Sequence, residues 1–80
     1  MKLFRTTWAC ETGTVYQSHL SALNEHQAFN KAETYGTMAL YGIETGCIDL
    51  YVRCIGNTNQ EILPDELKII SSSEDEGGVN

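Results

Sequence analysis

A tripeptide that occurs twice constrains the fold of this chain more than any other feature of its sequence. Glu11-Thr12-Gly13 and Glu44-Thr45-Gly46 each separate two runs that are rich in residues typical of β-strands. Glycine can adopt the positive φ that a three-residue hairpin loop requires, so each copy indicates a turn between antiparallel strands. The sequence therefore predicts two hairpins, residues 2–10 with 14–22 and residues 37–43 with 47–55.

Both predicted hairpins separate apolar from polar side chains when they close around their central threonines. The first then has Phe4 opposite Leu20 and Trp8 opposite Tyr16 on one face, and Arg5 opposite His19 and Thr7 opposite Gln17 on the other. The second has Met38 opposite Val52 and Leu40 opposite Leu50 on one face, and Thr37 opposite Arg53, Ala39 opposite Tyr51 and Tyr41 opposite Asp49 on the other. A sheet with one buried face requires this separation, and a shift by one residue would invert it.

A helix is predicted between the two hairpins. Asn24 is a good N-cap, and Gln27 three residues later completes a pair resembling a capping box. Gly36 suits the position just after the last helical turn. The side chains expected to form one apolar stripe on this helix are Ala28, Phe29, Ala32 and Tyr35.

The remainder of the chain completes the predicted fold. Pro64 prevents an uninterrupted central strand in residues 61–70, which we expect to end in a short strand or a helical turn. Residues 71–80 are Ser, Gly and acidic residues with almost nothing apolar, which predicts a disordered acidic tail. The prediction is one α+β domain over residues 1–70, with a single antiparallel sheet, one helix packed on one face and the order ββαββ(β).

Charge and hydropathy restrict the partners. The net charge is −6, from 5 basic and 11 acidic residues, which disfavours direct binding to a nucleic-acid backbone. We expect a protein partner with a basic surface, although the charge is also compatible with solubility alone. The chain has no apolar run of about 18 residues and no signal-peptide pattern at Met1, so we expect a cytoplasmic protein without membrane contact.

The cysteines and histidines do not form a recognisable catalytic or metal-binding pattern. Cys47 and Cys54 fall on opposite faces of one predicted strand, and neither His19 nor His26 has a cysteine at a metal-ligand spacing. Cys10 and Cys54 are expected on the buried face of the sheet, where a thiol is usually part of the core. The sequence therefore predicts free thiols, no metal, no cofactor and no enzymatic activity.

The sheet face opposite the helix is the candidate binding surface. Tyr and Arg are over-represented at the centres of protein interfaces, although they also suit an ordinary solvated sheet face. The residues that we expect to contact a partner are Arg5, Gln17, His19, Tyr41, Asp49, Tyr51 and Arg53.

The layout resembles a known group of proteins. A hairpin, then the strand-to-helix segment Ser-Ala-Leu-Asn-Glu-His-Gln-Ala-Phe-Asn-Lys-Ala, then further strands is similar to small phage-encoded accessory proteins. Among them it is most similar to compact α+β anti-CRISPR proteins that act on type I surveillance complexes, over residues 2 to 70. The resemblance implies a stoichiometric inhibitor in the host cytoplasm that docks on a basic nucleic-acid-binding groove such as that of a Cascade subunit. We expect the chain itself to be a monomer or weak homodimer. The alternative is a phage or bacterial interaction or structural module with no inhibitory role.

Overall fold

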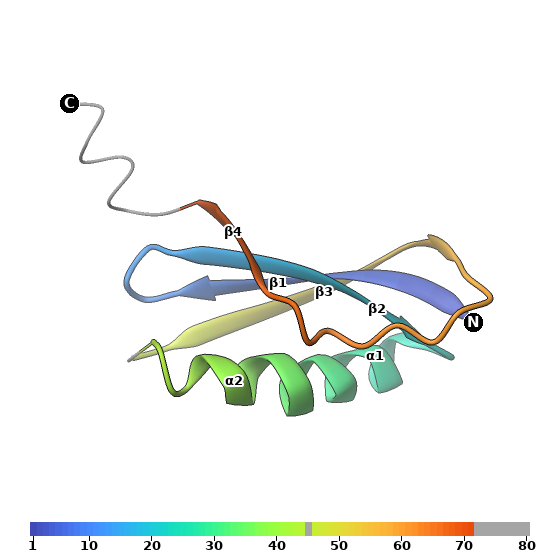
Figure 1. The fold of residues 1–80 in the computed structure, drawn as a ribbon, viewed down its shortest axis with the longest axis horizontal. Helices are drawn as coiled ribbons and strands as arrows, with labels where there is room; N and C mark the ends of the chain where they lie inside the picture. The colour runs from blue at the N-terminus through green and yellow to red at the C-terminus, as the bar shows by residue number, and fades with distance from the viewer. Residues whose placement is uncertain (45, 72–80) are drawn as a thin grey trace.

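The protein folds as one sheet covered on one face by a helical layer (Figure 1). The structure, a computed structural model, describes residues 1–44 and 46–71. The sheet contains β1 (Lys2–Cys10), β2 (Val15–Ala22), β3 (Ile48–Asn57) and β4 (Lys68–Ser71), all antiparallel to their neighbours in the order β3-β1-β2-β4. The predicted α+β class and the ββαββ order are confirmed.

The first predicted hairpin is confirmed together with its register. Phe4 lies opposite Leu20, and Trp8 lies opposite Tyr16. Gly13 has a φ of 95°, which supplies the positive φ that the turn requires. This part of the fold follows from local alternation, because β1 and β2 bury every second side chain up to Leu20, after which Ser21 and Ala22 are both buried.

The second predicted hairpin is wrong. Residues 37–40 are helical, and β3 pairs with β1 instead, with Arg53 opposite Arg5 and Tyr51 opposite Thr7. β1 therefore lies between β2 and β3, which run parallel to each other on its two sides. The prediction failed because alternation along β3 fixes which face each side chain occupies but not which strand lies beside it.

The helical layer runs without interruption from Glu25 to Leu40. It consists of α1 (Glu25–Lys31), the π-helical segment η1 (Ala32–Thr37) and α2 (Met38–Leu40). The N-cap prediction is confirmed, because the backbone N–H of Gln27 donates to Asn24 Oδ1 at 2.8 Å. The Gln27 side chain in turn accepts from the backbone N–H of Leu23, also at 2.8 Å.

Gly36 continues the helix instead of ending it, because Trp8 packs directly against it. A Cβ built on Gly36 would overlap the six-membered part of the Trp8 indole, coming within 2.8 Å of Cη2. The indole N–H donates to Thr37 Oγ1 at 2.9 Å. A π-helical turn widens the helix locally, and here two consecutive residues, Gly36 and Thr37, are buried. Tertiary packing thus overrides the local tendency of glycine to end a helix.

The core lies between the sheet and the helical layer. Burial on the helix recurs every four residues, at Ala28, Ala32, Gly36 and Leu40. Phe29 and Tyr35, expected in the apolar stripe, are instead 40% and 48% exposed. The buried hydrophobic residues are Phe4, Trp8, Cys10, Tyr16, Leu20, Ala22, Ala28, Ala32 and Leu40.

The chain after β3 returns along the outer edge of β2 (Figure 1). The backbone N–H of Ser21 donates to the Ile62 carbonyl at 2.9 Å, and the backbone N–H of Ile62 donates to Ser21 Oγ at 2.7 Å. Pro64 is fully buried, and the uncertain end of residues 61–70 is the strand β4. Ser71 is the last residue of β4, so the predicted tail otherwise lies outside the described residues.

Candidate protein-binding face

The sheet face opposite the helices, here called the open face, brings six of the seven predicted site residues together. Arg53, Arg5 and His19 lie in one row across β3, β1 and β2. Tyr51, Thr7, Gln17 and Lys68 lie in the adjacent row, which extends to β4. Asp49 lies one row further along β3, opposite Ala9. Within residues 1–44 and 46–71, no helix covers this face (Figure 1).

Tyr41 does not belong to the open face. It follows α2, its backbone N–H donates to the Thr37 carbonyl at 3.1 Å, and its side chain is 61% exposed. The prediction placed Tyr41 opposite Asp49 in the second hairpin, which does not form. Tyr41 therefore belongs to the helical layer, on the other side of the sheet.

Basic side chains are concentrated on the open face. Three of the five basic residues of the chain, Arg5, Arg53 and Lys68, lie on the open face, where Asp49 is the one described acidic residue. The remaining described acidic residues lie in the helices and loops: Glu11, Glu25, Glu33, Glu44, Glu61, Asp65 and Glu66. A net charge of −6 thus conceals a locally positive surface.

Lys68 was missed by sequence analysis. Its segment was left undecided between strand and helix, and only the pairing of β4 with β2 places Lys68 opposite Gln17. A polar residue beginning the short apolar run Lys68-Ile69-Ile70 is a weak strand signal, because three residues do not establish a period of two.

The two Glu-Thr-Gly segments lie against each other, although only the first forms a hairpin turn. The backbone N–H of Glu11 donates to the Cys47 carbonyl at 2.8 Å, and the Glu11 carboxylate accepts from the Cys47 N–H at 2.8 Å. Glu44 accepts from the Thr12 hydroxyl at 2.8 Å and from the Tyr16 hydroxyl at 2.7 Å. The carboxylates of Glu11 and Glu44 therefore hold the β1–β2 turn against the connection into β3.

Burial and the Glu44 carboxylate together raise the pKa of two groups, Tyr16 and Cys10. The hydrogen bond from the Tyr16 hydroxyl to Glu44 raises the pKa of Tyr16 from 10.0 to about 12. Burial and the nearby negative charges of Glu44 and ionised Cys10 act in the same direction. Burial, with a smaller effect of Glu44, also raises the pKa of the Cys10 thiol. A raised thiol pKa lowers the thiolate population, which makes Cys10 a poor nucleophile.

We expect the Tyr16 contribution to stability to depend on alkaline pH. Because the folded pKa lies above the unfolded value, the contribution is complete below pH 10 and is lost as the pH rises towards 12. Urea unfolding between pH 9 and 12 should show the stability advantage of the wild type over Tyr16→Phe shrinking with pH. Two curves that stay parallel over that range would contradict the Tyr16–Glu44 hydrogen bond.

The other candidate chemical groups are dispersed. Cys54 was expected to be buried but is exposed. It lies on the outer strand, beside the register shift between β3 and β1. Cys47 is exposed as well. Within residues 1–44 and 46–71, no group of three or more His, Cys, Asp and Glu side chains is placed to hold a metal ion. None of the helices in the described part of the chain is long and apolar enough to cross a membrane.

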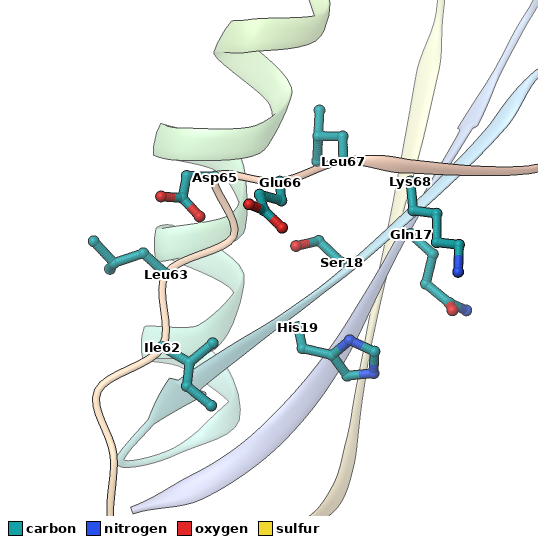
Figure 2. A pocket seen from close by; sticks show the side chains of 9 residues that line it. All are labelled: Gln17, Ser18, His19, Ile62, Leu63, Asp65, Glu66, Leu67 and Lys68. Atoms are coloured by element: carbon teal, nitrogen blue, oxygen red, sulfur yellow. The ribbon is translucent and has the colours of Figure 1, made fainter.

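A pocket of about 710 Å³ lies between the edge of β2 and the segment leading into β4 (Figure 2). Asp65 and Glu66 approach it from that segment, and Ser18 approaches it from β2. His19 and Lys68 lie on the side towards the sheet, apart from the two carboxylates. The lining residues are Gln17, Ser18, His19, Ile62, Leu63, Asp65, Glu66, Leu67 and Lys68. The pocket therefore borders the open face at its β2–β4 side.

No protein-family model, curated protein or solved structure matches this chain. The candidate site is an open sheet surface with one exposed tyrosine and three basic side chains, bordered by a pocket with two carboxylates.

Proposed function

We propose that this chain is a non-catalytic protein-binding module that acts stoichiometrically through its open face. The observation that carries the proposal is the two-row arrangement in which Tyr51 and Arg53 on β3 lie beside Thr7 and Arg5 on β1. Arg and Tyr, together with Trp, are enriched among the residues with the largest effects at protein interfaces. Tyr51 is 60% exposed and packs under no other layer, so the fold does not require its ring for the core.

The charge of the open face selects its partner. Arg5, Arg53 and Lys68 together outnumber Asp49, so this face suits an acidic protein surface. The basic partner surface expected from the net charge would instead meet the acidic side chains of the helical layer. The two expectations drawn from the sequence thus concern opposite sides of the molecule.

Charge reversal on β1 tests the open face. Arg5→Glu should weaken binding to the isolated partner roughly thirtyfold, since an arginine anchor is commonly worth about 2 kcal/mol or more. Lys2→Glu is the matched control, because it makes the same change on the same strand at a position on the opposite face. Binding can be measured by isothermal titration calorimetry with folded variants. Equal affinities for the two variants would show that the open face is not the interface. Binding of single-stranded nucleic acid instead of a protein would show that the proposed class of partner is wrong.

The helical layer supports a second candidate, the stoichiometric inhibition of a type I CRISPR surveillance complex. Glu25, Phe29 and Glu33 follow one another at four-residue spacing and are all exposed, so they form one row on the outer helix surface. An exposed aromatic between two carboxylates suits a basic, nucleic-acid-binding groove. This candidate rests on the resemblance in layout together with that row.

The second candidate predicts a different set of sensitive residues. Titrated against a type I surveillance complex, the protein should abolish DNA binding at about one equivalent, and Glu25→Lys with Glu33→Lys should remove the effect while Arg5→Glu does not. Full inhibition at a small fraction of one equivalent would instead indicate catalysis.

A further inference from the structure

The outer edge of β3 has no partner strand in the described part of the chain. β3 is ten residues long, about 33 Å, and stands at the end of the order β3-β1-β2-β4. Folded proteins usually protect such an edge by proline, charged side chains, a bulge or a covering segment, because its free N–H and C=O groups pair readily with another strand. The charged side chains of β3, Asp49 and Arg53, have opposite signs. β3 contains no proline, and its register shift lies only at the end near Cys54.

The hydrogen-bond directions across the sheet identify which groups are free. The Ser21 N–H points away from β1, towards Ile62. Hydrogen-bond directions alternate from residue to residue along an antiparallel strand, so the even-numbered residues of β2 bond to β1. The even-numbered residues of β1 lie opposite them and bond back to β2, which leaves the odd-numbered residues of β1 to bond to β3. The Glu11 N–H to Cys47 bond continues the same pattern. The backbone groups of Leu50 and Val52 therefore point outwards from the free edge.

The side chains along this edge complement a second copy of themselves. Consider β3 set antiparallel to a second β3 with Tyr51 opposite Tyr51. Asp49 of each copy then lies opposite Arg53 of the other copy, one pair on either side of the two tyrosines. Leu50 then lies opposite Val52 on the helix side, where both are only partly buried in the single chain. Opposite charges directly across a strand pair stabilise it, and like charges destabilise it.

The same register satisfies the backbone. Leu50 and Val52 have outward N–H and C=O groups, so Leu50 of one copy and Val52 of the other exchange two hydrogen bonds. Tyr51, whose backbone bonds face β1, becomes the non-hydrogen-bonded pair on the two-fold axis. Side-chain charge, burial and hydrogen-bond direction thus agree on one register.

We propose that two copies of this chain associate through antiparallel pairing of their β3 edges, with a two-fold axis at Tyr51. The occupant is a second copy because the order Asp49, Tyr51, Arg53 becomes its own complement when reversed. The two sheets form one eight-stranded sheet with both helical layers on one side. The open faces then make one continuous surface.

Cross-linking tests the register. Cα atoms in a non-hydrogen-bonded pair lie about 4.5 Å apart, which is within disulfide range. In a Cys47→Ser, Cys54→Ser background, Tyr51→Cys should form a covalent dimer under mild oxidation. Asp49→Cys is the control and should remain monomeric, because the two copies of position 49 would be about 13 Å apart. Equal cross-linking of the two variants would overturn the register.

A charge swap tests the association without any new cysteine. In sedimentation equilibrium the wild type should show a concentration-dependent mass, and Arg53→Asp should raise the dissociation constant by about tenfold or more, because it places aspartates opposite each other twice. The double variant Asp49→Arg/Arg53→Asp should restore wild-type association. A monomeric mass for the wild type at millimolar concentration, or no restoration by the swap, would refute the proposal. Neither measurement involves the partner of the open face, so this result is independent of the binding function.

Discussion

Gly36→Ala is expected to lower the free energy of unfolding by about 3 kcal/mol, the upper part of the usual range for overpacking a core. The added Cβ would overlap the Trp8 ring, which is fully buried and cannot move aside without disturbing its hydrogen bond to Thr37. The intrinsic helix preference of alanine acts in the opposite direction and is worth only about 1 kcal/mol. Urea unfolding followed by circular dichroism measures the net effect.

Two further variants make this prediction specific to the contact with Trp8. Gly42→Ala is the matched control, because the nearest atom to its Cβ would be 3.8 Å away, and its stability should change by less than about 1 kcal/mol. Trp8→Phe removes the ring atoms that the Cβ would meet, so Gly36→Ala should cost clearly less in that background. Equal costs in both backgrounds would show that the helix does not lie against Trp8 at this position.

Leu40→Ala should cost about 2–5 kcal/mol, the range for deleting a large buried aliphatic side chain. Leu40 is fully buried under the sheet, whereas Met38, two residues earlier, is 63% exposed. Met38→Ala is therefore expected to change stability by no more than about 0.5 kcal/mol. Both variants can be measured by urea unfolding in the same buffer.

This pair distinguishes the observed helix from the second hairpin. In a strand, residues two apart share one face, so Met38 and Leu40 would both be buried and both substitutions would be costly. On the observed helix they lie on different sides. Similar large losses for both variants would favour the hairpin and would contradict the pairing of β3 with β1.

Local patterns predicted the parts of the fold that depend on neighbours in sequence. The register of β1 with β2 follows from alternation on both sides of a short turn, and the helix start follows from Asn24 and Gln27. The second Glu-Thr-Gly segment misled the prediction because its role is tertiary: Glu44 accepts hydrogen bonds from Thr12 and Tyr16, more than 25 residues away. Sequence spacing alone does not contain that information.

Six of the seven candidate residues share one sheet face although the second predicted hairpin is wrong. The reason is that the face on which a side chain lies does not depend on which strand is paired with its own. Asp49, Tyr51 and Arg53 share the open face whether β3 pairs with residues 37–43 or with β1, since alternation fixes the face. Tyr41 was lost because its own segment became helical. Gly36 carried an ambiguous signal, since its missing side chain serves a helix end and a close approach to Trp8 equally well.

The central place of β1 also orders the events of folding. Its pairing with β2 closes a loop of a few residues, whereas its pairing with β3 joins segments about 45 residues apart across the whole helical crossover. Loop-closure entropy makes the distant pairing the slower step, so the first hairpin forms with one side of β1 still bare. During that interval the bare edge of β1 can also pair with a β3 strand from another molecule, in competition with its own. The topology thus carries an inherent route to strand exchange while the chain is being synthesised.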